Sequence, residues 1–300
     1  MAKVCVLLSA YNGEKYLDAQ LQSLVSQRNV DIDVIVRDDG STDTTHEILA
    51  RWAENGKIKW YSGANLGWAM SFMHLLLNSQ DYDYYAFCDQ DDIWQENKLS
   101  VALEHLKQST GVPSCYFSNL TYWREGTPLQ KVFSTEMYFD KYTCLVQCKA
   151  YGCTMVFNKL LADLIKNHPP THVTAHDFWV FQTAVLVGHV YYDDNSYILY
   201  RQHGNNQEGA LKSYREVWAR RLAKSLPRLR NQHSVESNAK ELIRCYGGYL
   251  SDETNQILLG LSEYRRSFKR YLLLLFSDKY VMDNFESNIW LKLKILFGRL

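Results

Sequence analysis

The sequence predicts an α/β fold with a mainly parallel central sheet flanked by helices, followed by a helical C-terminal extension. Apolar runs of strand length alternate with segments of helical periodicity four times within about the first hundred residues, which is typical of right-handed βαβ units in a parallel sheet. The middle of the chain is less regular. Beyond residue 210, apolar residues recur at helical spacing, with helical patterns at residues 257–276 and 289–300. These observations favour one α/β domain with a helical tail.

Each predicted strand of the N-terminal part ends in a polar loop that precedes a helical segment. The apolar runs that predict these strands are residues 4–8, 33–37, 58–61 and 84–88. In the middle of the chain, further strands are expected at residues 114–119, 152–157, 190–192 and 197–200. An apolar helix is expected at 178–187, and the polar, glycine-flanked residues 201–209 are expected to form a mobile loop.

Three acidic residues follow the apolar run at residues 84–88 and form the most informative group in the chain. Asp89, Asp91 and Asp92 come directly after this buried run, and a helix is expected to begin near Trp94. Three carboxylates at such a place repel one another and lose solvation, so they need a cation or hydrogen-bond donors nearby. Their oxygens suit a hard divalent ion that also binds a substrate phosphate. The position agrees, because ligands of open α/β sheets bind at the carboxyl ends of the strands.

Spacing alone does not establish a metal site, because Asp-x-Asp triplets also occur at residues 31–33 and 81–83. Neither of these triplets follows an apolar strand, and we interpret both as solvated turns. An EF-hand loop is excluded, since Ile93 and Trp94 stand where that loop requires a polar ligand and a glycine. The chain also lacks the G-x-G-x-x-G and P-loop fingerprints of dinucleotide and NTP binding.

The composition is that of an ordinary globular protein. Of the 300 residues, 46% are hydrophobic and 22% are charged, and 33 basic residues balance 33 acidic ones, which gives no indication of a nucleic-acid partner. The 7 cysteines lack zinc-knuckle spacing and several lie in apolar runs, which favours reduced thiols in a cytoplasmic protein. We expect no signal peptide and no membrane-spanning helix.

Residues 212–230 form a basic amphipathic segment that contains a single acidic residue, Glu216. Apolar residues such as Trp218 and Leu222 are interleaved with the charges at helical spacing. Such a segment is either a solvated face or a contact with an anionic membrane surface, and we favour the membrane contact. Its basic residues are Lys212, Arg215, Arg220, Arg221, Lys224, Arg228 and Arg230.

Seven motifs in order resemble a known family. SAYNGEKYL, VIVRDDGSTDTT, NLGWAMSF and FCDQDDIWQENKL resemble family 2 glycosyltransferases with the GT-A fold, the fold of nucleotide-diphospho-sugar transferases. GCTMVF, AHDFWV and LYRQHGNN resemble the rhamnosyltransferase branch of bacterial cell-wall and capsule polysaccharide synthesis. The resemblance implies a catalytic domain at 1–210, with a nucleotide-binding half at 1–108 and an acceptor half at 109–210. Residues 211–300 would be a membrane-associating helical extension.

The resemblance also implies which residues bind the nucleotide. Ser9 and Tyr11 would border the base. Asp39 would accept a hydrogen bond from the base imide, and Asp38 would support that loop. Asp89 would contact the ribose or the water shell of the metal.

The remaining implied residues surround the diphosphate and the acceptor. Asp91 would ligate the Mg²⁺ or Mn²⁺ ion that bridges the diphosphate, with Asp89 and His203 as further candidate metal residues. Arg201 and His203 would lie beside the diphosphate on a closing loop. Asp177 would be the catalytic base. From the residues alone, an N-cap is the better supported interpretation of Asp177, and an ordinary loop position remains open for His203.

Together these expectations describe a metal-dependent inverting glycosyltransferase. A nucleotide-sugar donor already carries its leaving group as a diphosphate, so one carboxylate base suffices when a divalent ion takes up the developing charge. The expected donor is dTDP-rhamnose, with UDP-galactose or UDP-glucose as alternatives. The expected acceptor is a lipid-linked polysaccharide at the inner face of the cell membrane.

Two other classes of protein fit the sequence less well. A non-catalytic nucleotide-sugar-binding module in a polysaccharide assembly would be favoured by the loss of a motif, and none is lost. A sugar nucleotidyltransferase would need a glycine-rich basic loop after the first strand. Residues 9–13 do not supply such a loop.

Overall fold

The computed structural model describes residues 2–124, 127–133, 137–202 and 234–300. The chain divides into two compact units, residues 1–138 with 148–201 and residues 139–147 with 202–300. The predicted domain boundary at residue 210, the basic segment at 212–230 and His203 all lie outside the described residues.

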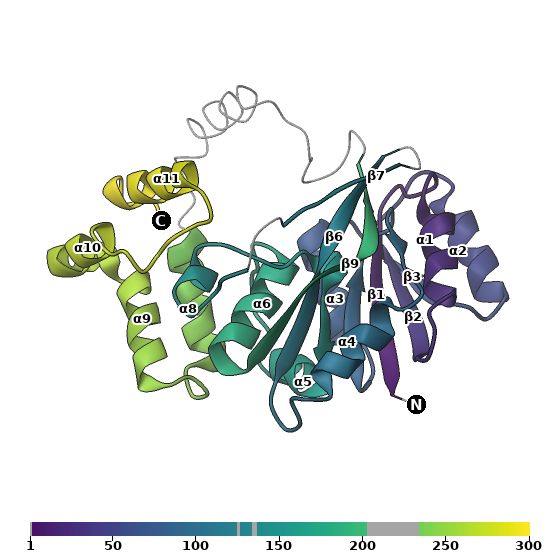
Figure 1. The fold of residues 1–300 in the computed structure, drawn as a ribbon, viewed down its shortest axis with the longest axis horizontal. Coiled ribbons are helices and arrows are strands. Elements are labelled where there is room, and N and C mark those ends of the chain that lie inside the picture. Colours follow the sequence, from purple (N-terminus) through teal and green to yellow (C-terminus); the bar gives the residue numbers. More distant parts are fainter. Residues whose placement is uncertain (1, 125–126, 134–136, 203–233) are drawn as a thin grey trace. The chain divides into compact units, whose positions relative to one another are not determined.

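The first unit is built on a mixed sheet, several strands of which are labelled in Figure 1. Its described strands follow the order β3–β2–β1–β4–β8–β6–β9–β5, with β7 paired to β6. The four strands β1 to β4 are parallel, as the alternating pattern predicts. β8 then pairs antiparallel with both β4 and β6, which makes the complete sheet mixed. The strands are β1 (Lys3–Ala10), β2 (Asp31–Asp38), β3 (Lys59–Ser62), β4 (Tyr84–Cys88), β5 (Ile93–Trp94), β6 (Ser114–Arg124), β7 (Thr127–Lys131), β8 (Val156–Asn158) and β9 (His189–Arg201).

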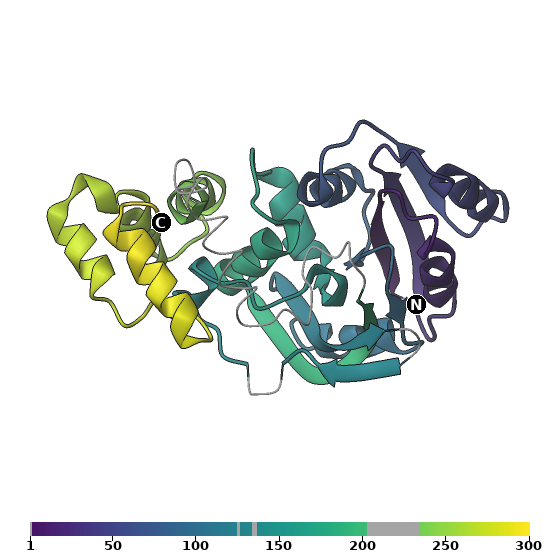
Figure 2. The same cartoon turned by 90° about the horizontal axis from the view of Figure 1, so that it is seen from above.

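Helices pack on both sides of the central strands (Figure 2). Alternate side chains of a strand point to opposite faces, so Val6 and Leu8 of β1 join the core on the side of α1, α2 and α4. Phe87 of β4 contacts Phe72 of α3 and Phe157 of β8. Burial on both faces explains why these strands are apolar without alternation. The helices are α1 (Leu17–Val25), α2 (Thr45–Glu54), α3 (Trp68–Asn78), α4 (Lys98–Leu106), α5 (Lys159–Asn167) and α6 (His176–Val187).

The prediction of two separate strands at 190–192 and 197–200 is wrong, because β9 is one long strand. Its register against β6 shifts between Ser118 and Asn119, so the polar residues between the two apolar runs form an irregularity within the strand. Asp193 Oδ1 accepts the backbone N–H of Asn195 at 2.8 Å and holds this irregularity locally. A bulge absorbs extra residues without ending a strand, so the polar residues between the two apolar runs do not divide β9.

Two further boundaries differ from the prediction. The strand expected at 152–157 begins only at Val156, because Gly152–Thr154 is a 3₁₀ turn in which Gly152 O accepts the N–H of Met155 at 3.0 Å. The helix expected near Trp94 begins at Lys98 instead. Trp94 forms β5, which pairs with β9, and its N–H donates to Ser23 Oγ at 3.1 Å.

The described part of the second unit is helical. The single helical pattern expected at 257–276 is divided in two, because Ser267 starts a new helix by accepting the N–H of Arg270 on its hydroxyl. The elements are η1 (Thr143–Leu145), α8 (Ser234–Tyr246), α9 (Asp252–Ser262), η3 (Tyr264–Arg266), α10 (Phe268–Leu275) and α11 (Phe285–Leu296).

Two expectations from composition can be compared with the structure. All 7 cysteines lie in the described residues as free thiols, and most are buried. Within the same described ranges, no helix has both the length and the apolar character needed to cross a bilayer.

Candidate active site

The carboxyl ends of β1, β2 and β4 meet at one edge of the sheet, as the sequence predicts. Ala10 is in register with Asp38, and Leu8 is in register with Cys88. The N–H of Asp39 donates to Ala10 O at 2.7 Å, which ties the first two loops together. Ser9 near the end of β1, Asp39 directly after β2 and Asp89 directly after β4 therefore lie at the same edge of the sheet, which we call the rim.

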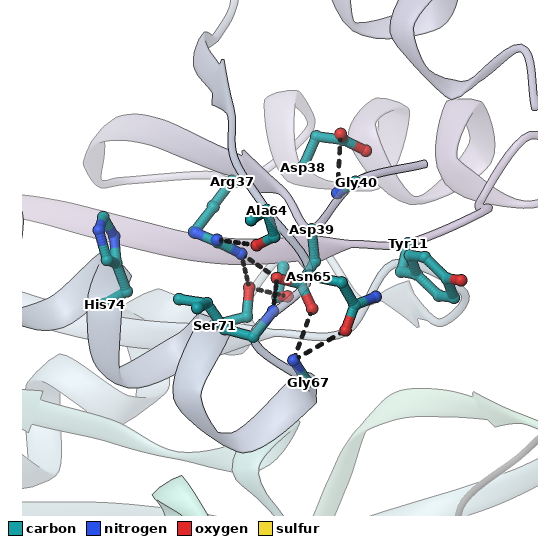
Figure 3. Close-up of polar contacts among 12 residues, drawn as sticks. Tyr11, Arg37, Asp38, Asp39, Gly40, Ala64, Asn65, Gly67, Ser71 and His74 are labelled. Carbon is teal, nitrogen blue, oxygen red and sulfur yellow. Dashed lines mark hydrogen bonds and ion pairs between the residues drawn. The ribbon is translucent and has the colours of Figure 1, made fainter. Parts of the chain in front are cut away.

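Asp39 is buried at this rim in a network that the sequence analysis did not foresee (Figure 3). Its carboxylate pairs with Arg37 and accepts the backbone N–H groups of Leu66 at 2.8 Å and Gly67 at 3.0 Å. Arg37 Nη1 also donates to Ser71 Oγ at 3.0 Å. In the sequence, the feature that could have pointed to Arg37 is its charge at the end of an otherwise apolar strand. These bonds fix the orientation of Asp39 before any ligand arrives, and its contact with a base remains a prediction.

Ser9 belongs to the same network, since its hydroxyl donates to Ser71 Oγ at 2.6 Å. Tyr11, by contrast, is exposed at the rim. Its backbone is held by Gln90, whose side chain accepts the N–H of Tyr11 at 2.9 Å and donates to its carbonyl at 3.0 Å. Gln90 stands between the two acids of the Asp-x-Asp triplet. It thereby joins the loop after β4 to the loop after β1.

Asp38 is fully buried and holds the loop that follows β2. Burial alone would raise its pKa, but hydrogen bonds from Ser41, His46 and Ser62 hold the pKa of Asp38 below its ordinary value. The closest of these donors is His46 Nε2, at 2.7 Å from Asp38 Oδ2. These bonds hold Asp38 within the loop, and its part in nucleotide binding stays a prediction.

Asp89, Asp92 and Cys153 form the one group among the described residues whose potential metal-ligand atoms lie within 4.8 Å of one another. Burial, together with the charges of Asp91 and Asp177, raises the pKa of Asp89 to about 7. Burial and the neighbouring acids raise the pKa of Asp92 well above its usual range. Asp92 Oδ1 accepts the N–H of Arg201 at 3.1 Å, and its Oδ2 is buried without a hydrogen-bond partner.

This environment fits a divalent cation, because a positive ion would relieve the repulsion that raises these pKa values. The donor set within 4.8 Å does not include Asp91. However, Asp92 has no exposed surface, whereas Asp91 is partly exposed on the same loop. A cation that also binds a substrate phosphate must be reached from solvent. Asp91 therefore remains the predicted ligand, with Asp92 behind it, and His203 lies outside the described residues.

Arg201 lies against the acidic loop at the end of β9. Its Nε donates to Asp91 O at 2.7 Å. Its guanidinium stacks over the rings of Trp123 and Tyr16, at 4.1 Å and 4.4 Å from their centroids. The structure thus brings the predicted Arg201 to Asp91, although 110 positions separate them in the chain.

Lys98 is a buried cation near the same loop that the sequence analysis missed. Its Nζ lies 3.6 Å from the centroid of the Trp94 ring and has no hydrogen-bond partner. Burial lowers the pKa of Lys98 to about 8, while the neighbouring Cys153, Cys88 and Asp92 act in the opposite direction. Its position in a helical pattern gave no sign of this environment. The acidic loop therefore has a compensating cation behind it.

Asp177 lies in the first turn of α6. The N-cap residue of this helix is Ala175, so the N-cap interpretation of Asp177 is wrong. Asp177 Oδ2 accepts the N–H of Gly152 at 3.2 Å, and Oδ1 accepts the N–H of Phe178 at 2.7 Å. Its charge contributes to the raised pKa of Asp89. The candidate base and the acidic loop therefore occupy one electrostatic neighbourhood.

Gly152 allows the close approach of α6 that positions Asp177. A Cβ atom at Gly152 would lie 2.6 Å from His176 Nε2 and 3.4 Å from Asp177 Cβ. Gly152→Ala is expected to destabilise the fold by about 1–3 kcal/mol through overpacking, and to slow turnover by as much as about 10²-fold through displacement of Asp177. Denaturant unfolding and turnover rates measure the two effects. A Gly152→Ala protein with wild-type stability and turnover would contradict this geometry.

His176 is buried against aromatic rings, and neither of its ring nitrogens has a hydrogen-bond partner. Its ring stacks on Phe72 at a centroid distance of 4.1 Å and meets Phe87 edge-on at 4.7 Å. Burial lowers the pKa of His176 from 6.5 to about 3. The ring is therefore a neutral packing element at neutral pH.

The lowered pKa of His176 predicts a loss of stability in acid. Between pH 7.5 and 5.5 the unfolded chain gains a proton at His176 that the folded chain does not bind, so this residue should reduce the free energy of unfolding by about 1.4 kcal/mol. His176→Leu should remove this part of the pH dependence in urea unfolding. The exposed His172 provides the control, because His172→Leu should keep the full slope. Equal slopes for wild type and His176→Leu would refute the assignment.

Comparison with known proteins bears on the family and the fold of the chain. The family model described as Glycosyl transferase family 2 matches residues 5–165. The dTDP-rhamnosyl transferase RfbG of Shigella flexneri is 30% identical over 232 residues, which cover 71% of this chain and 77% of RfbG. The structure of residues 1–349 of S. aureus TarS in complex with UDP-GlcNAc superposes with a TM-score of 0.57 at 17% identity, covering 90% of this chain and 83% of that TarS fragment. The mannosyltransferase PcManGT of Pyrobaculum calidifontis, in complex with GDP-Man and Mn²⁺, gives a TM-score of 0.50 at 14% identity, covering 99% of this chain and 86% of that chain.

Proposed function

The chain belongs to glycosyl transferase family 2, and we propose that it catalyses the metal-dependent, inverting transfer of L-rhamnose from dTDP-rhamnose to a lipid-linked polysaccharide. The observation that carries the proposal is the proximity of Asp177 to the acidic loop. Asp177 accepts the N–H of Gly152, and the next residue, Cys153, has its Sγ within 4.8 Å of carboxylate oxygens of Asp89 and Asp92. A base and a donor-binding rim in one place are what a displacement at a sugar carbon requires.

Asp177 carries the proton transfer in this mechanism. The N–H groups of Gly152 and Phe178 orient its two oxygens. The carboxylate accepts the proton of the acceptor hydroxyl while that oxygen attacks the anomeric carbon on the face opposite the diphosphate. The new C–O bond forms as the bond to the diphosphate breaks, and the configuration inverts.

The rim holds the donor while this displacement occurs. Asp91 and Asp89 would hold a divalent ion, which when bound supplies positive charge for the departing diphosphate. The guanidinium of Arg201 lies beside Asp91 and adds a second cation for the same oxygens. Asp39, oriented by Arg37, would accept the imide N–H of the base, with Tyr11 at the rim beside it.

Thymine and uracil both offer this imide group, so the proposed choice of dTDP-rhamnose rests on RfbG of Shigella flexneri. UDP-galactose and UDP-glucose are the alternative donors. The proposed metal, Mn²⁺ or Mg²⁺, is supported by the oxygen donors of the acidic loop and by the Mn²⁺ in the PcManGT complex. The proposed location is the cytoplasmic face of the membrane, where a lipid-linked acceptor would be met.

A panel of nucleotide-sugars tests the proposed donor. Melting temperatures should be measured with dTDP-rhamnose, UDP-glucose and UDP-galactose, each with Mn²⁺ and with EDTA. A ligand that binds only the folded state at 100 times its Kd stabilises it by about 2.7 kcal/mol. We expect the largest shift for dTDP-rhamnose with Mn²⁺. A larger shift in melting temperature for a UDP-sugar would assign that UDP-sugar as the donor in place of dTDP-rhamnose. No shift for any nucleotide-sugar would contradict donor binding by this chain.

A further inference from the structure

The last two described helices expose large apolar side chains. Phe268 of α10, Phe276 just after it and Phe285 of α11 are exposed by 76%, 79% and 80%. Leu296 of α11 and Phe297 beyond it are exposed as well. Large apolar side chains that gather on an exposed surface commonly mark a binding site in a soluble protein.

The apolar residues of α10 form a stripe along one side of the helix. Phe268, Leu272 and Phe276 recur at intervals of four residues, which places them one above another on a helical surface. A shallow, open groove of about 490 Å³ lies beside Leu272 and Phe276 of this stripe. The groove is lined by Lys269, Leu272, Leu273, Phe276 and Ser277.

α11 is attached to α10 and presents a second stripe. Tyr271 Oη donates to Leu296 O at 3.0 Å, and Lys292 Nζ donates to Ser277 O. Phe285 and Ile289 of α11, four residues apart, are both exposed. These hydrogen bonds join the two helices, and we call their exposed apolar side chains together the α10–α11 face.

Positive charge accompanies this apolar surface. Residues 263–300 contain eight lysines and arginines against four acidic residues. Glu263 forms ion pairs with Arg266 and Arg270. Within the described part of the chain, Lys269 in the groove and Lys294 on α11 have no carboxylate partner. A second copy of this basic surface would be repelled, whereas an anionic surface would be attracted.

We propose that the α10–α11 face binds the surface of an anionic lipid bilayer. The helices have 8 and 12 residues, far fewer than the roughly 20 needed to cross a bilayer, so they would lie in the interface. The phenylalanines and leucines enter the boundary between headgroups and acyl chains, and the lysines contact the lipid phosphates. The residues of this face are different from those of the basic segment at 212–230. The proposed bilayer contact holds whichever nucleotide-sugar the chain uses as donor.

Cosedimentation with lipid vesicles tests this proposal on the full chain. Phosphatidylcholine vesicles are compared with and without phosphatidylglycerol. We expect the wild type to sediment with the anionic vesicles and less so at high salt. Phe268→Ser/Phe276→Ser should weaken the partition by more than about tenfold, since each buried phenylalanine contributes roughly that much. Lys269→Glu should weaken it specifically on the anionic vesicles.

Leu160→Ser is the matched control, because Leu160 is an exposed apolar residue of α5 in the other unit. It should bind vesicles as the wild type does. Wild-type vesicle binding by the double phenylalanine variant, or no binding by the wild type, would overturn the proposal. A concentration-dependent dimer that Phe276→Ser dissolves would also overturn it, by assigning the face to a second copy. Because the rim residues are untouched, donor binding should persist in every variant, which separates this test from that of the proposed function.

Discussion

Replacing Asp177 with asparagine is expected to lower the rate of sugar transfer by about 10³-fold, within the range of general-base catalysis. The amide has nearly the shape of the carboxylate and can still accept the N–H of Gly152. It cannot take a proton from the acceptor hydroxyl. The rate constant for transfer should therefore fall while donor affinity stays near the wild-type value.

The control for this variant is Asp163→Asn, which changes a partly exposed acid of α5 that pairs with Lys159. Its transfer rate should equal that of the wild type. Circular dichroism and thermal melting should show that Asp177→Asn is folded. Transfer at the wild-type rate by a folded Asp177→Asn protein would remove Asp177 from the mechanism.

Asp91→Asn is expected to weaken nucleoside diphosphate binding in the presence of Mn²⁺ by more than about a hundredfold. Even the loss of an outer-shell partner costs a metal site about 10–100-fold in affinity, and Asp91 is the acid of the loop proposed to ligate the ion. Titration calorimetry with dTDP, in Mn²⁺ and in EDTA, measures the effect. The variant should bind equally weakly in both, because the metal-dependent part of the affinity is lost.

Asp31→Asn provides the comparison, because Asp31 belongs to an Asp-x-Asp triplet that does not follow a buried strand and is exposed. That variant should bind dTDP as the wild type does. If Asp91→Asn retained full metal-dependent affinity and Asp92→Asn lost it, the ion would instead be held by the buried group of Asp89, Asp92 and Cys153.

In the parallel half of the sheet, β1 and β4 were the most predictable strands, because they are almost entirely buried and therefore apolar in nearly every position. β9 was divided in error because its bulge carries polar residues that resemble a turn. β7 was not predicted, since all of its residues are exposed and no apolar pattern marks them. The division of the helix at Ser267 depends on a cap that a continuous apolar pattern conceals.

The acids of the rim were predictable because strand ends in a parallel sheet share one edge. Their supporting residues were not. Arg37, Lys98 and Gly152 act through contacts with residues distant in the chain, and such contacts leave no local pattern. The buried orientation of Asp39 likewise depends on the loop before α3, which supplies the N–H groups of Leu66 and Gly67.

Turnover of dTDP-rhamnose by the purified full-length chain tests the central claim most directly. Release of dTDP is followed with Mn²⁺ and with EDTA, in the presence of lipid extract as a source of acceptor. We predict release that requires the metal, exceeds that from UDP-glucose and UDP-galactose, and is lost in Asp177→Asn. A folded wild-type protein that binds the nucleotide-sugar yet releases no nucleoside diphosphate from any donor would contradict the proposed transfer.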